Sequence, residues 1–195
     1  DVVAKSAPDG YTIAVVATSH AINPSVYAKM PYDTARDLAP VTHTVNLTNV
    51  LVTNPSVPAR NLRELIALAK AKPGSITFGS AGIGQSNHLS GEMLKAAAGI
   101  DIVHVPYKGS AAAMNDVLAG HISMMFVDLL SATPHTKAGK LRVLAATGLQ
   151  RSASALDIPT LNESGVAGFN GNSWLGLVGR AGTPNMTASE MNRIV

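Results

Sequence analysis

Cysteine is absent from the 195-residue chain, and charged and aromatic residues are scarce. Without cysteine there is no disulfide, thiolate metal site or cysteine nucleophile, and the chain is compatible with an oxidising compartment. Charged residues make up 14% and aromatic residues 4%, and the 15 lysines and arginines are scattered, so the net charge of +3 forms no basic, stacking surface for nucleic acid. No apolar run is long enough to span a bilayer, and no targeting signal indicates a location.

Hydrophobic residues are abundant, at 46% of the chain, which indicates an ordered globular protein. Its length suits one domain or two small ones with a substantial core. The histidines lack the His-x-x-x-His spacing of a helical zinc site, so no metal site is predicted; they are His20, His43, His88, His104, His121 and His135. His104 lies in an alternating apolar run and is interpreted as a partly buried histidine rather than a ligand.

Short apolar runs alternate with amphipathic segments along the chain. The runs at 12–17, 49–53, 75–78, 102–105, 122–127, 141–146 and 174–178 predict buried strands. Helices are predicted between Asn61 and Pro73, over 87–98, over 110–120 and, as a short one, from Thr133 to Gly139. This alternation predicts an α/β fold with mostly parallel sheets, in which ligands bind at the carboxyl ends of strands.

Residues 75–91 contain a short apolar run, a glycine-rich turn and the polar start of a helix. Unpaired N–H groups at a helix start, together with the helix dipole, favour an anion, and glycines allow it to approach closely. The phosphate-loop spacing is nearly met, but Gln85 stands where that motif requires lysine. A dinucleotide fingerprint is broken by Asn87 at the third glycine position. The segment is therefore either a site for a different anion or a simple strand-to-helix turn.

Other polar residues follow predicted strands, and their roles stay open. The imidazole of His88 either donates to a bound anion or caps and packs the helix. Asp128 either accepts a hydrogen bond from a ligand or caps the next turn. Lys108 is interpreted as a solvated turn residue. A hydrolase built from Ser86, His88 and Asp128 is disfavoured, because no Gly-x-Ser-x-Gly elbow is present and Ser86 and His88 do not face one another on a helix.

The chain resembles, over essentially its whole length, the Bug family of periplasmic solute receptors of tripartite tricarboxylate transporters, also called TctC-type proteins. The similarity is carried by Ala7–Thr12, Ala21–Pro24, Pro31–Asp33, Asp37–Val41, Leu65–Lys70, Gly82–Glu92, Val103–Ser110, Ala138–Arg142, Pro159–Thr160 and Glu163–Gly165. The resemblance implies a two-lobed type II periplasmic binding protein, or Venus flytrap, truncated at both ends. An incomplete lobe 1 would comprise 1–73 and 172–195, and lobe 2 would comprise 74–171.

The resemblance further implies a monomeric, non-enzymatic receptor in the periplasm, which needs no cofactor. It would capture a small carboxylate and deliver it to membrane transporter subunits, and it would not bind nucleic acid. The ligand-binding residues it implies are Ser19, His20, Gly82, Gly84, Gln85, Ser86 and His88, with Asp128 as a further candidate. At Asp128 the chain departs from the pattern, because Val127 stands where many relatives place aspartate directly after phenylalanine. The alternatives are a two-lobed sensing or regulatory domain and, less favoured, a serine hydrolase.

Overall fold

The computed structural model describes residues 1–184, and its contacts divide them into two units. Unit 1 contains 1–47 and the segment from Ser173 onward, and unit 2 contains 48–172. The predicted lobe boundary at 73 therefore needs correction, because residues 48–73 belong to unit 2, where strand β3 (Asn49–Thr53) pairs with two strands of its sheet. Residues 185–195, assigned by sequence to lobe 1, lie outside the described residues.

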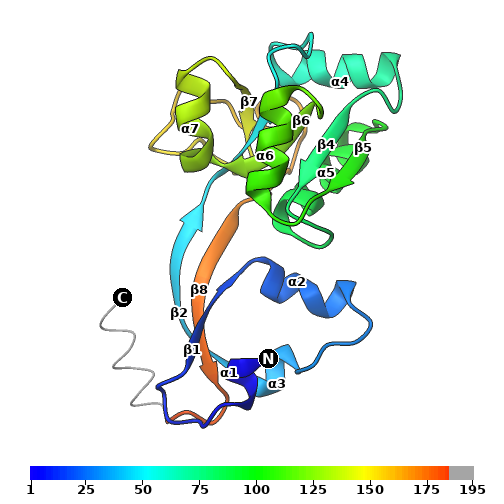
Figure 1. Cartoon of the computed structure of the whole chain (residues 1–195). Coiled ribbons are helices and arrows are strands. Elements are labelled where there is room, and N and C mark those ends of the chain that lie inside the picture. Colours follow the sequence, from blue (N-terminus) through cyan, green and yellow to red (C-terminus); the bar gives the residue numbers. More distant parts are fainter. Residues whose placement is uncertain (185–195) are drawn as a thin grey trace. The chain divides into compact units, whose positions relative to one another are not determined.

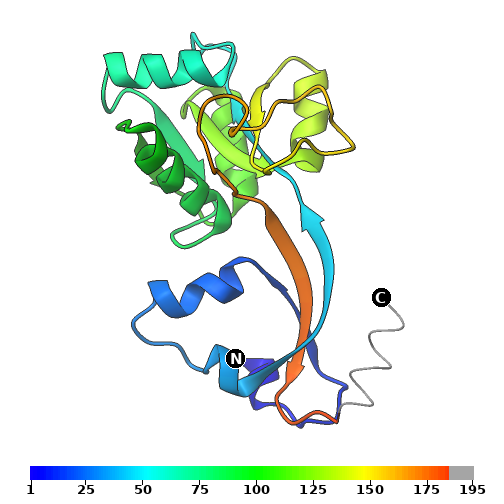
Figure 2. The ribbon, with the colours of Figure 1, turned by 180° about the vertical axis from the view of Figure 1, so that it is seen from behind.

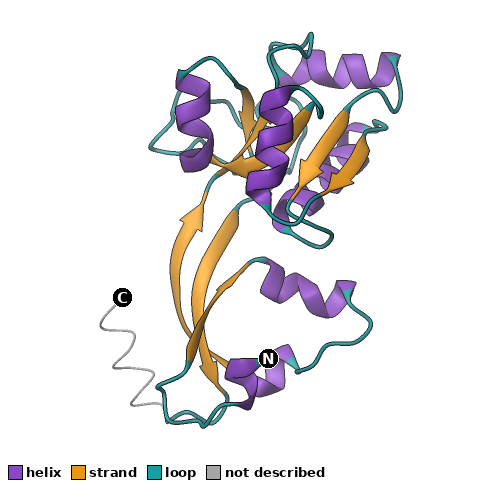
Figure 3. Cartoon of the chain, viewed as in Figure 1, coloured by secondary structure: helices purple, strands orange, loops and turns teal. Residues whose placement is uncertain are grey.

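Unit 1 is built on a three-stranded sheet of order β1-β8-β2 (Figure 3). Its strands are β1 (Ile13–Ala17), β2 (Leu38–Leu47) and β8 (Ser173–Arg180), and its helices are α1 (Val2–Lys5), α2 (Ser19–Val26) and α3 (Thr34–Asp37). Both pairings are antiparallel. Among its described residues, the buried apolar cluster consists of Ala4, Leu38 and Val178. The sequence predicts β1 and β8 but not β2, whose two register shifts interrupt the alternation of side chains.

Unit 2 contains a five-stranded sheet of order β5-β4-β6-β3-β7. Besides β3, its strands are β4 (Thr77–Ser80), β5 (Val103–Pro106), β6 (Met124–Asp128) and β7 (Arg142–Ala146). Strand β4 is parallel to β5 and β6, whereas β3 is antiparallel to both β6 and β7. The expectation of mostly parallel sheets is wrong for unit 1 and only half right here, because hydrophobic periodicity identifies a buried strand but not its direction.

Helices cover both faces of the unit 2 sheet. They are α4 (Leu62–Ala71), α5 (Ser86–Ala98), α6 (Ser110–Ala119) and α7 (Leu129–Lys137). Helices α4 and α5 contribute to one buried cluster with Phe78 and Phe126, and α6 and α7 contribute to a second cluster with Val50 and Met125. Helices α6 and α7 are in front in Figure 1, and α5 is in front in Figure 2. Among the described residues, no helix combines the length and apolarity that a bilayer crossing requires.

Side-chain capping accounts for the starts of α4 and α7 in unit 2. The Asn61 side-chain oxygen accepts a hydrogen bond from the Glu64 backbone N–H at 2.9 Å. The Glu64 carboxylate accepts one from the Asn61 side-chain nitrogen at 2.8 Å, so the two residues pair at the start of α4, as the sequence predicts. Helix α7 begins at Leu129, four residues before the predicted start at Thr133. The reason is Asp128, which caps the helix and thereby places Pro134 inside it.

Candidate functional site

The carboxyl edge of the unit 2 sheet is the place where the topology predicts a ligand. The chain passes from β4 to β5 through α5 on one face, and from β5 to β6 through α6 on the other face. The direction of the connections therefore reverses beside β4, and ligands of open α/β sheets bind at such a switch point. Ser80 ends β4 there, Asp128 ends β6, and Asn49 at the start of β3 pairs with Asp128.

The glycine loop, residues 81–85, joins β4 to α5 at this edge. It is tied to the turn after β5, because the Tyr107 N–H donates to the Ser80 carbonyl at 3.0 Å and the Gly109 N–H donates to the Ala81 carbonyl at 3.2 Å. Gly82 has φ +137° and Gly84 has φ +80°. These backbone angles strain a residue with a side chain, so the turn requires glycine at both positions.

Most N–H groups of the glycine loop already have an acceptor inside unit 2. The Ala81 N–H donates to Asn87 Oδ1 at 3.2 Å, and the Gly84 N–H donates to His88 Nδ1 at 3.2 Å. The Gly82 N–H donates to the Ser80 hydroxyl at 3.1 Å, and the Gln85 N–H donates to the Gly82 carbonyl at 3.3 Å. The ring of His88 thus accepts a hydrogen bond within unit 2. Of the two roles that the sequence leaves open for His88, this contact fits a structural role, and a ligand role stays a prediction.

The donors left without a partner lie one step further on, in the first turn of α5. Gln85 caps the helix without a side-chain hydrogen bond. Within residues 1–184, no acceptor is found for the Ser86 hydroxyl or for the backbone N–H groups of Ser86 and Asn87. These three donors lie at the N-terminal end of α5, where the helix dipole gives partial positive charge. Together they can hold both oxygens of a carboxylate.

Two histidine rings and a phenylalanine ring lie in contact beside the glycine loop. The ring centroids of His88 and His104 are 4.2 Å apart, and those of His104 and Phe78 are 4.9 Å apart. His104 Nε2 lies 2.6 Å from the Ser80 hydroxyl, so His104 is a bonded, partly buried residue, as the sequence predicts. Burial lowers the pKa of His104, positive charge on His88 lowers it further, and the Glu92 carboxylate opposes both effects.

Asp128 serves as the N-cap of α7. Its carboxylate accepts a hydrogen bond from the Ser131 N–H at 2.8 Å. Of the two roles left open by the sequence, capping is therefore formed in the structure, and a ligand role stays a prediction. Lys108 is exposed, in agreement with a solvated turn residue.

Ser19 and His20 lie in unit 1, in the first turn of α2. His20 lines a pocket of about 430 Å³ together with Leu38 and Trp174, and burial lowers its pKa. The predicted site residues therefore fall into two groups. The residues from Gly82 to His88 are neighbours in unit 2, with Asp128 on an adjacent strand edge, and Ser19 and His20 belong to the other unit.

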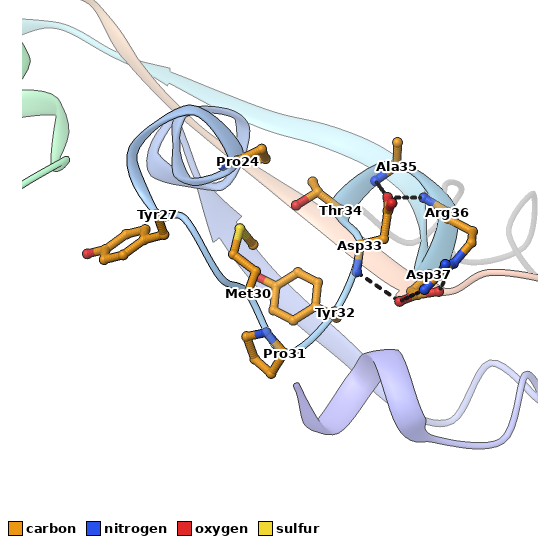
Figure 4. Close-up of a pocket in the computed structure, with 10 residues that line it drawn as sticks. All are labelled: Pro24, Tyr27, Met30, Pro31, Tyr32, Asp33, Thr34, Ala35, Arg36 and Asp37. Carbon is orange, nitrogen blue, oxygen red and sulfur yellow. Dashed lines mark hydrogen bonds and ion pairs between the residues drawn. The ribbon is translucent and has the colours of Figure 1, made fainter.

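A larger pocket of about 620 Å³ lies between α2 and α3 in unit 1 and was not predicted (Figure 4). Its polar side chains bond to one another. Asp33 caps α3 by accepting from the N–H groups of Ala35 and Arg36, and Arg36 donates to Asp37 at 2.8 Å. The Arg36 hydrogen bond, supported by the Asp33 N–H, lowers the pKa of Asp37 to about 2. These residues therefore account for the structure of α3 rather than for a ligand.

The hydrolase alternative gains no support from the site. No hydrogen bond joins Ser86 to His88 in the part of the chain that is described, and His88 Nδ1 already accepts from Gly84. A nucleophile and its base must be within hydrogen-bond reach. No group of three or more histidine, aspartate or glutamate side chains that could hold a metal ion occurs within residues 1–184.

Sequence reasoning missed the residues that hold the glycine loop in place. From the sequence, Asn87 is predicted only to start a helix and to break a dinucleotide fingerprint, and Ser80 is given no role of its own. The signal that could have identified them is a polar side chain directly before a glycine loop, such as Ser80, or in the first helical turn after it, such as Asn87. Such side chains can accept hydrogen bonds from nearby N–H groups.

Comparison with known proteins gives consistent matches. A sequence model described as the tripartite tricarboxylate transporter family receptor, TctC, matches residues 1–193. Protein BugT of Bordetella pertussis is 34% identical over 195 residues, which cover 99% of this chain and 60% of BugT. The R. palustris protein Rpa4515, solved with adipate, has a TM-score of 0.92 at 34% identity, over 98% of this chain and 64% of that protein.

MatC from Rhodopseudomonas palustris, solved with bound malate, has a TM-score of 0.87 at 26% identity, over 98% of this chain and 65% of MatC. The α/β fold of a periplasmic binding protein, predicted from the resemblance, is confirmed by the structure of the periplasmic binding protein BugD, which has a TM-score of 0.88 at 32% identity over 97% of this chain and 63% of BugD. The chain spans less than two thirds of the length of each of these relatives.

Proposed function

The chain belongs to the TctC family of tripartite tricarboxylate transporter receptors, and from that premise we propose that it captures a small organic acid outside the cytoplasm. Family members are periplasmic solute-binding proteins rather than enzymes. Two structures similar to this chain are those of proteins solved with adipate and with malate, both dicarboxylates. The observation within this chain that supports the proposal is the set of unpaired donors at the start of α5.

In this proposal one ligand carboxylate accepts hydrogen bonds from the Ser86 hydroxyl and from the N–H groups of Ser86 and Asn87. No lysine or arginine is present in the glycine loop or in the first turn of α5, so the negative charge is balanced by N–H dipoles and the helix dipole. Hydrogen bonds to an ionised acceptor contribute about 1.5–3 kcal/mol each. Three such bonds can therefore select a carboxylate without a cationic side chain.

Contributions from Ser19, His20 and Asp128 to ligand binding stay predictions. Delivery of the acid to membrane transporter subunits is likewise part of the proposal, and it follows from the family rather than from any contact in this chain. The particular acid is left to experiment, with adipate and malate as the first probes.

Calorimetric titration of the chain with adipate and malate tests this function. Ser86→Ala removes one donor to the ionised carboxylate and should weaken binding by about 1.5–3 kcal/mol. Ser75→Ala is a matched control, since Ser75 precedes β4 at the opposite end of that strand. Unchanged affinity in Ser86→Ala would remove Ser86 from the site, and binding of neither acid would count against a dicarboxylate ligand.

A further inference from the structure

We propose that Asn87 and His88 are positioning residues, which hold the glycine loop of unit 2 through side-chain acceptors and so leave the first-turn donors of α5 open for the ligand. This inference rests on the proposed function for its consequence in binding. It changes the role of His88, which the family resemblance had suggested as a ligand contact.

The geometry reverses the usual direction of helix capping. An N-cap side chain normally precedes the helix and accepts from N–H groups in its first turn. Here Asn87 and His88 lie inside the first turn and accept from N–H groups that precede the helix, those of Ala81 and Gly84. Asn87 is nearly fully buried, at 7% exposure, and its Oδ1 accepts both from the Ala81 N–H at 3.2 Å and from the His88 N–H at 3.1 Å.

The bond from Gly84 fixes the protonation state of the His88 ring. Because the Gly84 N–H donates to Nδ1, that nitrogen has a free lone pair, and the proton of the neutral ring is on Nε2. Protonation of the ring converts Nδ1 into a donor. The Gly84 N–H then loses its acceptor, and this part of the loop is released.

The surroundings of His88 disfavour a doubly protonated histidine pair. The His104 ring of β5 is tilted against the His88 ring, with the ring centroids 4.2 Å apart, and bonds to Ser80 of β4. Glu92 and Lys95 of α5 are the other charged groups that act on the pKa of His104, and they act in opposite directions. Burial and the positive charge of His88 both lower the pKa of His104.

Nuclear magnetic resonance of the ¹⁵N-labelled chain tests the inference without a ligand. The ring nitrogens of His88 should show the Nε2–H form at neutral pH, and protection of the Gly84 amide from exchange should fall wherever Nδ1 of the ring carries a proton. His88→Asn retains an acceptor that does not titrate, so its Gly84 amide should stay protected throughout. His88→Leu retains no acceptor, so its Gly84 amide should exchange rapidly at every pH.

The same variants, titrated with adipate, test the consequence for binding. We expect His88→Leu to lose roughly tenfold in affinity, the equivalent of one hydrogen bond, and His88→Asn to stay within about twofold of the parent chain. An Nδ1–H ring at neutral pH, or equal Gly84 protection in the two variants, overturns the inference. If adipate fails to bind the parent chain, the proposed function fails instead, and the ligand-free measurements still decide the role of His88.

Discussion

Side-chain acceptors determine which N–H groups of the glycine loop are available to a ligand. Asn87 and His88 occupy the N–H groups of Ala81 and Gly84, and the free donors belong to Ser86 and Asn87. The sequence pattern predicts an anion-type site at this helix start. It does not reveal that the loop satisfies its own donors, because that depends on which rotamers the first-turn side chains adopt in the folded chain.

Tyr107→Phe should make the free energy of unfolding less dependent on pH. The Tyr107 hydroxyl donates to the Asp116 carboxylate at 2.5 Å, which raises the pKa of Tyr107 to about 12 and lowers the pKa of Asp116. A carboxyl pKa that is lower in the folded state stabilises the fold above its unfolded-state value, and the effect is lost as pH falls through the folded value. The stability gap between parent and variant should thus be present at neutral pH and shrink below about pH 4. Urea unfolding at both pH values measures it, and a gap that grows in acid contradicts the assignment.

Asp128→Ala separates capping from ligand binding. Loss of the bond from the Ser131 N–H should lower the free energy of unfolding by about 1 kcal/mol, and Asp128→Ser should restore most of it, because serine is also a good N-cap. If capping is the whole role, adipate affinity is the same in all three proteins. A loss of affinity in Asp128→Ser, despite restored stability, would instead assign Asp128 to the ligand.

At the scale of elements, close packing of α5 on β4 sets the position of the site. A Cβ added at Gly91 would lie 2.1 Å from the Phe78 ring, so only glycine fits. The sequence analysis noted that Asn87 replaces the glycine used for such packing in dinucleotide folds. The structure meets the same need one turn later in the helix, and Asn87 is left free to hold the loop.

Gly91→Ala should therefore lower the free energy of unfolding by about 1–3 kcal/mol, the usual cost of overpacking, even though alanine is the better helix former. Phe78→Leu in the same chain makes room for the added methyl group. A double-mutant cycle by urea unfolding should show that the two changes together cost less than their sum. Strict additivity would mean that the ring does not exclude the methyl group.

The elements that the sequence predicts best are those with local signals. Helices α4, α5 and α6 are found within one or two residues, because periodicity, the Asn61–Glu64 capping pair and glycines such as Gly120 mark them. Strand β2 and the direction of β3 are not found, because they depend on pairing with β8, β6 and β7, which are distant in sequence. The early start of α7 depends on one side chain, Asp128.

At the scale of the whole chain, the two units differ in how much apolar surface they bury. Unit 2 is one continuous segment with two clusters of buried residues, whereas unit 1 consists of two separated segments with a cluster of three. Residues Val50 to Val52 of β3 are fully buried, while Val15 of β1 is 68% exposed. The candidate hydrogen-bond donors to a ligand carboxylate therefore lie on the unit with the larger buried core.

Amide hydrogen exchange should reflect this difference. Exchange is slowest where opening requires loss of a buried core, so β3 and β6 should exchange most slowly, and β1, an edge strand of the unit 1 sheet, should exchange faster. Mass spectrometry of peptic fragments measures both regions in one experiment. Equal protection of β1 and β3 would mean that the two units open together.

Binding of a carboxylate at the first turn of α5 can be measured by amide shift mapping of the 195-residue chain with adipate or malate. We expect saturable shifts at the Ser86 and Asn87 amides, which become weaker in Ser86→Ala and stay unchanged in Ser75→Ala. Such mapping also detects weak binding. Saturable binding that shifts other amides and leaves Ser86 and Asn87 unaffected would contradict the account.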